Sequence, residues 1–261
     1  RMVEIESVSL VQPTTSSLQL QKDDGTTSAK HSHVQIQYQK PATAFQHPNA
    51  GVMISSLHWI LNSISKIALN GGDNTNTSST NKSSRTKPRM LEMYCGCGAH
   101  TIPLAKSTIL SEIVALERDD RLVNACRNNC RLNDCLNEHD SCNNDGNERT
   151  LVKVVKGDAT EWAAKTLRGR CKHDTNPEQF DILLVDPPRD GLSATVCDMA
   201  MNGTFAHIIY VSCGKRALLR DLTILCGKTG SFDVVDLAVI DLFPGTPSVE
   251  TLVHLKRRQK N

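Results

Sequence analysis

Two reactive side chains follow two apolar segments of the chain and could act together in one site. Asp186 comes directly after residues 181–185, and Cys213 comes directly after residues 207–212. Each apolar segment predicts a buried strand of a parallel sheet, whose carboxyl edge is where open α/β sheets bind ligands. A carboxylate and a thiol at one edge predict an enzyme, although a buried cysteine is more often inert packing.

The turn after Asp186 carries two prolines, which make the backbone rigid and fix the direction of the carboxylate. An aromatic residue after Asp-Pro-Pro is typical of enzymes that methylate exocyclic amines, and Arg189 in its place argues against that chemistry. Glu250 ends a Pro/Gly-rich turn at residues 241–250. It is a candidate general base, with a carboxylate on an edge strand as the alternative interpretation.

A glycine turn at residues 94–98 is the first candidate ligand-binding element. Gly96 and Gly98 lead from a predicted strand into a helix, so backbone N–H groups can face a ligand. Thr101 stands where a dinucleotide-binding motif has its third glycine. The turn therefore suits a cofactor without a pyrophosphate, such as S-adenosylmethionine, and an ordinary strand–helix turn is the alternative.

Two acidic residues follow the next two predicted strands. Glu117 lies roughly 20 residues beyond the glycines, where a carboxylate can bind the two ribose hydroxyls of a nucleoside cofactor. Alone it would be read as a solvated carboxylate, but together with the glycine turn it favours binding. Asp158 could lie near the adenine, and the slightly favoured interpretation is that it caps the helix predicted from residue 160.

Alternating strand and helix patterns supply the framework that must hold these side chains. The predicted strands are residues 90–94, 113–117, 151–155, 181–185, 207–212, 232–240 and 250–256, and the predicted helices are residues 101–109, 120–132, 160–167, 192–201 and 215–226. Repeated βα units predict a parallel sheet with right-handed crossovers. The last two strands have no helix between them and should pair antiparallel. We expect an α/β, Rossmann-like fold with a seven-strand, mostly parallel sheet and helices on both faces.

The first 43 residues differ in pattern from the rest. Residues 2–11 and 34–38 alternate apolar and polar side chains and predict two half-exposed strands joined by a polar loop. We interpret residues 1–43 as the remnant of a preceding β-rich segment and residues 44–261 as the catalytic domain. The chain opens on Arg1 rather than Met, which suggests a fragment of a longer protein.

A helix and two polar insertions complete the organisation. Residues 50–69 carry apolar side chains at helical spacing, with Asn49 as a plausible N-cap. The apolar positions are Met53, Leu57, Ile60, Leu61, Ile64 and Ile67. Residues 70–88 and 139–149 are polar and without periodicity, so they are expected to be disordered insertions.

Composition limits the classes of function. The chain has 261 residues, 39% hydrophobic residues and a net charge of +2, which fit one large domain and do not by themselves predict a polyanion partner. Its ten cysteines include no Cys-x-x-Cys pair, so no metal site is expected. No signal peptide or membrane-spanning segment is recognisable. The expectation is an intracellular monomer with reduced thiols; the cytoplasm or nucleus is favoured, and an organelle is the open alternative.

Taken together, these segments resemble the RNA uracil-5-methyltransferases, and their form is closest to the eukaryotic tRNA branch. The resemblance covers roughly residues 34–256. The matching motifs are Phe-x-x-Pro-Asn (45–49), Tyr-Cys-Gly-x-Gly (94–98), the acidic end of the second strand, Asp-Pro-Pro-Arg-x-Gly-Leu (186–192), Ser-Cys (212–213) and Asp-x-Phe-Pro-x-Thr ending in Glu (241–250).

The resemblance implies a class I S-adenosylmethionine-dependent methyltransferase that makes 5-methyluridine in RNA, with tRNA as the expected substrate. It implies that Cys213 is the nucleophile that adds to uracil C6 and that Glu250 removes the C5 proton. The implied cofactor contacts are Tyr94, Gly96, Gly98, Glu117, Asp186 and His47. The iron–sulfur cluster of some bacterial members is not expected, because its cysteines would lie upstream.

Three residues depart from the family pattern. His47 stands where Gln is usual, Ala99 where Asn is frequent, and Ser248 where His is common. These departures motivate a second hypothesis, a non-catalytic RNA-binding or chaperone protein on the same scaffold. A third hypothesis is a methyltransferase with another target, such as a cytosine or a protein side chain.

The predicted helix after Cys213 carries three cations that could contact RNA phosphates. They are Lys215, Arg216 and Arg220. A solvated helix face is an equally good interpretation of the same residues.

Overall fold

The computed structural model describes residues 4–11, 33–40, 50–70, 87–136, 149–171, 180–241, 245–246 and 249–259. The helices are α1 (Ala50–Asn70), α2 (Thr101–Lys106), α3 (Asp120–Leu132), α4 (Ala159–Cys171), α5 (Ala194–Asn202) and α6 (Lys215–Cys226). The strands are β1 (Glu4–Val11), β2 (His33–Lys40), β3 (Arg89–Met93), β4 (Glu112–Glu117), β5 (Leu151–Lys156), β6 (Ile182–Val185), β7 (His207–Ser212), β8 (Phe232–Ile240) and β9 (Glu250–Arg257). Nearly all of both predicted insertions, and Asn49, lie outside the described residues.

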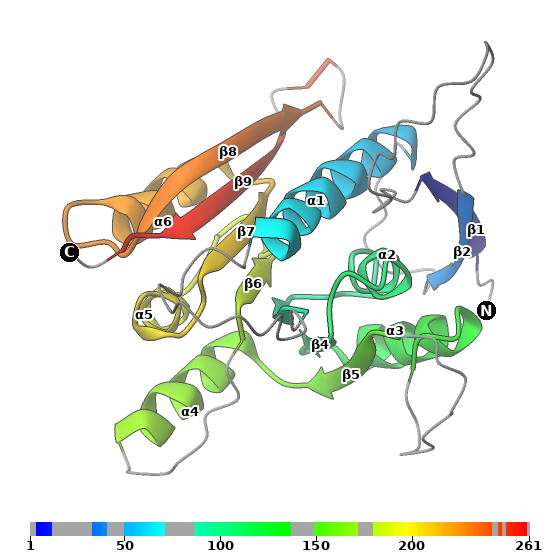
Figure 1. Ribbon diagram of the computed structural model, residues 1–261, viewed down its shortest axis with the longest axis horizontal. Coiled ribbons are helices and arrows are strands. Elements are labelled where there is room, and N and C mark those ends of the chain that lie inside the picture. Colours follow the sequence, from blue (N-terminus) through cyan, green and yellow to red (C-terminus); the bar gives the residue numbers. More distant parts are fainter. Residues whose placement is uncertain are drawn as a thin grey trace, which may run out of the picture.

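Seven strands form one sheet in the order β5-β4-β3-β6-β7-β9-β8 (Figure 1). The pairs from β5 to β7 are parallel, whereas β9 runs antiparallel to both β7 and β8. The predicted seven-strand, mostly parallel sheet and the antiparallel last pair are therefore confirmed. The chain leaves β3 in one direction through β4 and β5, and β6 then returns to its other side. This change of direction opens a crevice between β3 and β6, where ligands bind in open α/β sheets.

The helices cover both faces of the sheet, as predicted. Side chains of α1, α2 and α3 share one buried cluster with one set of strand residues, and side chains of α4, α5 and α6 share a second cluster with the other set. Successive strand residues point to opposite faces, so Met90 belongs to the first cluster and Leu91 to the second. All four residues of β6 are buried, because both faces of a central parallel strand are covered.

Helix α1 buries the apolar stripe that its sequence predicts. All six of its predicted apolar positions, which are Met53, Leu57, Ile60, Leu61, Ile64 and Ile67, lie in the core. Within the described residues, no helix combines the length and the apolar character needed to span a bilayer.

Two helix boundaries differ from the prediction for local reasons. The helix predicted over 101–109 ends at Lys106, because Thr108 adopts a φ of 55°, which an α-helix does not allow. Helix α5 begins one residue after Ser193, whose side chain accepts a hydrogen bond from the first turn and so serves as N-cap.

Strands β1 and β2 pair antiparallel in a separate small sheet beside α2 and α3 (Figure 1). In β2, Ile36 and Tyr38 are buried in the first core cluster, whereas Gln37 between them is exposed. The half-exposed pattern predicted for this strand is thus present, and its apolar face packs against the catalytic fold.

Candidate active site

Most of the predicted site residues gather at the carboxyl edge of the parallel strands. They are Tyr94 to Gly98 after β3, Glu117 at the end of β4, Asp186 after β6, Cys213 after β7 and Glu250 at the start of β9. Because β9 is antiparallel, its first residue lies at the edge where the parallel strands end. His47 and Ser248 lie outside the described residues, as does the Phe-x-x-Pro-Asn motif.

The sheet register places the thiol beside the candidate base. Ser212 on β7 pairs with Thr251 on β9 in antiparallel register. The ladder ends at this pair, and the next residues, Cys213 and Glu250, follow it at the same edge of the sheet. Two residues that are far apart in the sequence therefore meet at one point of the edge.

Glu250 has the environment of a general base. Its side chain is buried, and the hydroxyl of Ser56 on α1 donates a hydrogen bond to its Oε1 at 3.4 Å. Burial raises the pKa of Glu250, and the hydrogen bond from Ser56 opposes that rise. Sequence reasoning missed Ser56; the available signal was a small polar residue next to the apolar stripe of α1.

Cys213 is exposed, so a substrate can reach its sulfur. Partial desolvation raises the pKa of this thiol, and the carboxyl groups of Asp186 and Glu250 act in the same direction. The guanidinium of Arg189 opposes them, because a nearby cation stabilises a thiolate. The electrostatic effect of Arg189 on the thiol therefore explains a cation directly after the Asp-Pro-Pro turn.

Asp186 lies among acidic neighbours. Burial raises its pKa well above the usual value, and the nearby carboxyl groups of Glu250 and Glu92 raise it further. Acidic groups so placed cannot all ionise together at low cost. The site can therefore hold a proton among its carboxyl groups.

Glu92 is a second residue that sequence reasoning missed. It is fully buried on β3, and Thr101 donates a hydrogen bond to its Oε2 at 2.7 Å. Burial raises the pKa of Glu92 to about 8, and the bond from Thr101 partly offsets this effect. A carboxylate at an inward position of an otherwise apolar strand was the signal in the sequence.

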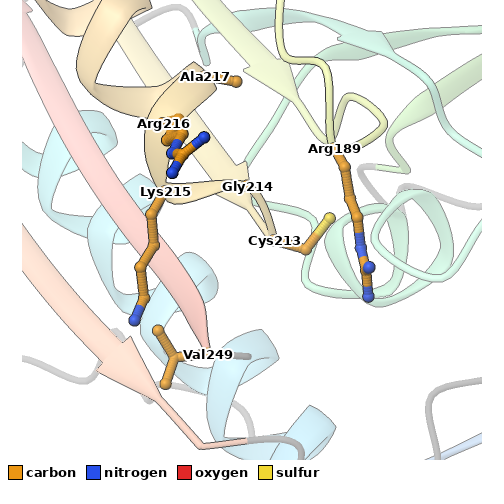
Figure 2. A pocket seen from close by; sticks show the side chains of 7 residues that line it. All are labelled: Arg189, Cys213, Gly214, Lys215, Arg216, Ala217 and Val249. Carbon is orange, nitrogen blue, oxygen red and sulfur yellow. The ribbon is translucent and has the colours of Figure 1, made fainter. Parts of the chain in front are cut away.

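A pocket of about 290 Å³ opens beside Cys213. Its lining residues are Arg189, Cys213, Gly214, Lys215, Arg216, Ala217 and Val249. Figure 2 shows the sulfur pointing into the pocket on the side of Arg189, whereas Lys215 extends toward Val249. A Cβ atom on Gly214 would collide with the carbonyl oxygen of Arg189. Glycine is thus needed there for the close approach that brings Arg189 next to Cys213.

A buried carboxylate on α6 holds the loop that carries Asp186 and Arg189. Asp221 accepts hydrogen bonds from the backbone N–H of Leu192 and from the hydroxyl of Tyr210, both at 2.8 Å. Arg220 donates to Asp221 and to the backbone carbonyls of Asp190 and Leu192. This clamp favours a structural role for Arg220 over the phosphate contact considered from the sequence.

The glycine turn has an unusual backbone. Tyr94, Gly96 and Gly98 have φ values of 66°, 56° and 90°, all in the left-handed region. Gly98 also packs closely, since a Cβ atom there would lie 3.0 Å from the sulfur of Cys126. A Cβ atom on Gly96 would meet none of the described residues within 4 Å. The turn therefore presents backbone to a free space in which a cofactor can lie.

Glu117 links this turn to the next loop. Its Oε2 accepts a hydrogen bond from the N–H of Gly96 at 3.1 Å, and its Oε1 accepts from the N–H groups of Arg118 and Asp119 at 2.7 and 2.8 Å. The carboxylate is thus fixed beside the glycine turn before any ligand binds. This placement fits a group that receives ribose hydroxyls.

Asp158 caps helix α4, which is the favoured sequence interpretation. Its Oδ1 accepts hydrogen bonds from the N–H groups of Thr160 and Glu161 at 2.9 and 3.2 Å. Nearby, desolvation raises the pKa of Tyr94 to about 12, so its hydroxyl stays protonated as a donor. No cluster of three or more His, Cys, Asp or Glu side chains within the described ranges is arranged to hold a metal ion.

Comparisons with known proteins agree with this architecture. The family model described as tRNA (uracil-5-)-methyltransferase matches residues 4–258. The tRNA/tmRNA (uracil-C(5))-methyltransferase of Sulfurimonas denitrificans is 28% identical over 236 residues, which cover 88% of this chain and 53% of that protein. The 23S rRNA (uracil(1939)-C(5))-methyltransferase RlmD of Xanthomonas oryzae is 31% identical over 170 residues, which cover 65% of this chain and 33% of that protein. The chain thus spans about half the length of such relatives or less.

Solved structures share the fold. The tRNA (uracil-54, C5)-methyltransferase of Pyrococcus abyssi, in complex with S-adenosyl-L-homocysteine, has a TM-score of 0.56 at 18% identity, covering 95% of this chain and 50% of that one. A SAM-dependent methyltransferase from Agrobacterium tumefaciens has a TM-score of 0.53 at 11% identity, covering 86% and 68%.

Proposed function

Since the chain belongs to the tRNA (uracil-5-)-methyltransferase family, we propose that it transfers a methyl group from S-adenosylmethionine to C5 of a uridine in RNA, preferentially in tRNA. The observation that carries the proposal is the placement of an exposed thiol, Cys213, and a buried carboxyl group, Glu250, directly beyond the last pair of residues that joins β7 to β9. This pair offers the two functions that C5 methylation needs, a nucleophile and a base.

The chemistry explains why both residue types are required. Uracil C5 is a poor nucleophile, and addition of the Cys213 thiolate to C6 converts the ring into an enolate that is reactive at C5. Bound S-adenosylmethionine would supply the electrophilic methyl group, and the S–CH3 bond would break with S-adenosylhomocysteine as the leaving group. Glu250 then removes the C5 proton, and elimination restores the C5–C6 double bond and frees the thiolate.

The local electrostatics support these roles. The pKa of Glu250 is raised by burial, which moves the carboxylate toward the range of an efficient general base. Arg189 favours the thiolate form of Cys213 against the effect of the neighbouring carboxyl groups. The pKa of the Cys213 thiol is still raised overall, so Arg189 only partly offsets desolvation and the neighbouring carboxyl groups.

The residues at the β3–β4 side of the edge fit the cofactor. Glu117 would hold the ribose, and the turn with Gly96 and Gly98 would lie against the nucleoside and methionine parts. Tyr94 and Asp186 flank the crevice between β3 and β6 and complete the proposed contacts. His47 is proposed from the sequence pattern alone.

The pocket beside Cys213 suits a flipped-out nucleotide. A uridine in folded RNA must leave its stack to reach a thiol, and its phosphates then need cations nearby. Arg189, Lys215 and Arg216 line this pocket, and none of the three has an ion-pair partner among the described residues. We propose that they contact the RNA backbone.

The finer proposals concern lineage, boundaries and assembly. The sequence form at 241–247 favours the eukaryotic tRNA branch, although the named relatives with sequence similarity are bacterial. We also propose an intracellular monomer with the catalytic domain over 44–261, preceded by the remnant of a β-rich segment. Sedimentation of the full-length protein tests the monomer.

The decisive experiment uses transcribed tRNA that contains 5-fluorouridine, incubated with the full-length protein and S-adenosylmethionine. Fluorine at C5 cannot be removed as a proton, so the enzyme should stall as a covalent complex on a denaturing gel. The band should disappear in Cys213→Ala and persist in Cys226→Ala. If the cofactor binds but no covalent band forms, another RNA or another target atom is favoured. If the cofactor does not bind and no covalent band forms, a non-catalytic RNA-binding protein is favoured.

A further inference from the structure

We propose that Tyr38 and Asn129 are positioning residues through which strand β2 holds the cofactor-binding turn in its bound shape. The proposal rests on the proposed function in one respect, because it takes the turn at 94–100 as part of the cofactor site. It makes the strand before the catalytic fold a determinant of cofactor affinity.

Asn129 of α3 and Asn133, the residue that caps the C-terminal end of this helix, bond to the backbone of β2 as a neighbouring strand would. Asn129 accepts from the N–H of Gln39 at 2.7 Å and donates to its carbonyl at 3.0 Å. Asn133 does the same with Gln37, at 3.0 and 2.7 Å. Four residues of helix rise about 6 Å and two residues of strand about 6.6 Å, so this spacing allows both side-chain amides to pair with alternate residues of β2.

Of these two asparagines, only Asn129 has a side-chain bond to the cofactor turn among the described residues. The Nδ2 of Asn129 also donates to the carbonyl of Cys97 at 2.9 Å. The hydroxyl of Tyr38, on the same strand, donates to the carbonyl of Ala99 at 3.1 Å. Both side chains are buried, at 0% and 1% exposure, so water competes little for these bonds. Because a peptide unit is planar, each bond fixes the orientation of a whole unit in the turn.

The turn needs such support because its backbone is strained. Tyr94 has a φ of 66° with a bulky side chain, and backbone in this region persists only where surrounding structure holds it. A turn released from Tyr38 and Asn129 would spend part of its time in other conformations. The apparent cofactor affinity falls in proportion to the fraction of molecules that keep the competent shape.

The test compares three variants of the full-length protein. Tyr38→Phe removes one hydroxyl and keeps the ring, and Asn129→Ala removes the bridge to Cys97. Asn133→Ala is the matched control, because Asn133 holds β2 in the same way and its side chain has no bond to the turn among the described residues. Calorimetry should show that S-adenosylhomocysteine binds about five-fold more weakly to the first two variants than to the wild-type protein. A change of this size corresponds to the loss of about one net hydrogen bond. The control should bind within about two-fold of wild type at a similar loss of thermal stability.

Hydrogen exchange of the ligand-free protein keeps this test separate from the proposed function. Amides of residues 95–101 should exchange faster in Tyr38→Phe than in Asn133→Ala. Unchanged exchange there, or equal weakening of binding by Asn129→Ala and Asn133→Ala, would overturn the proposal. Failure of the proposed function is seen elsewhere, as absence of the covalent RNA complex in the wild-type protein.

Discussion

The proposed cofactor half of the sheet edge, at β3–β4, and its thiol half, at β7–β9, differ in how their polar groups are held. At the β3–β4 half, Glu117 is fixed by three backbone N–H groups, and Asn129 and Tyr38 bond to carbonyls of the glycine turn. At the β7–β9 half, Cys213 is exposed and its pocket is lined by cations without described ion-pair partners. A small nucleoside cofactor is best met by a preformed site, whereas RNA brings its own charges to complete the other half.

Removal of the thiol should have the largest effect on activity, and it tests whether the two halves of the edge act separately. Cys213→Ala should lower methyl transfer to tRNA by roughly a thousand-fold or more, because Cys213 is the only thiol among the described residues that line the pocket. The affinity for S-adenosylmethionine should stay unchanged, since the cofactor half is built separately. Transfer of a radiolabelled methyl group gives the rate, and Cys226→Ala, at the C-terminal end of α6, serves as the control. Retained activity would exclude Cys213 as the nucleophile.

Glu250→Gln should have the second largest effect. Glutamine keeps the shape and can accept the hydrogen bond from Ser56, but it cannot take the C5 proton. We expect a loss of roughly a hundred-fold to a thousand-fold and accumulation of the covalent, methylated RNA complex on a denaturing gel. A slow variant without any accumulated complex would argue against Glu250 as the base.

Charge removal at the pocket should act on RNA and leave the cofactor half untouched. The double variant Lys215→Ala, Arg216→Ala should raise the KM for tRNA about ten-fold and reduce the salt dependence of binding by about one to two phosphate contacts. Lys228→Ala, two residues beyond the C-terminal end of α6, should change neither. Equal effects of both variants would indicate a general charge effect.

Arg189→Ala should shift the pH dependence of the thiol. The pKa of Cys213 is already raised by desolvation and nearby carboxyl groups, and Arg189 opposes this rise. Without Arg189 the pKa rises further, so the thiolate forms only at higher pH. The rate of alkylation by iodoacetamide, measured against pH, should move in the alkaline direction. An unchanged profile would mean that Arg189 does not act on the sulfur.

The smallest effect on activity is expected for Glu92→Gln, on strand β3. The folded protein holds a proton on Glu92 up to about pH 8, whereas the unfolded chain releases it near its ordinary pKa of about 4.3. The free energy of unfolding should therefore fall as pH rises between these two values. Glutamine mimics the protonated side chain and should flatten that part of the profile in urea titrations. If the free energy of unfolding of Glu92→Gln fell with pH as steeply as that of the wild-type protein, Glu92 would not be the group that holds the proton.

Some features could be read from single segments. The buried stripe of α1 follows from apolar spacing, and the cap at Asp158 follows from its place before a helix. The strand ends that carry Asp186 and Cys213 were recognisable because apolar runs stop at polar turns. In each case the relevant physics acts within a few residues of chain.

Other features depend on residues that are distant in the sequence. Ser56 lies 194 positions from Glu250, and Tyr38 lies 61 positions from Ala99, so no local pattern connects them. Arg220 looked like a free cation on a helix face, yet its partners belong to a loop about thirty residues earlier. Such hydrogen bonds exist only after the crossovers have brought their partners together.

The sequence by itself determined the order of strands and helices, the polar turns at their ends and the residue types available for chemistry, because backbone preference and hydrophobic periodicity act locally. Only the tertiary structure decided that β9 enters the sheet antiparallel beside β7, which brings Glu250 to the edge that carries Cys213. It also decided that Asn129 of α3 links β2 to the glycine turn. The physical reason is that burial on both faces of one sheet fixes which distant segments become neighbours.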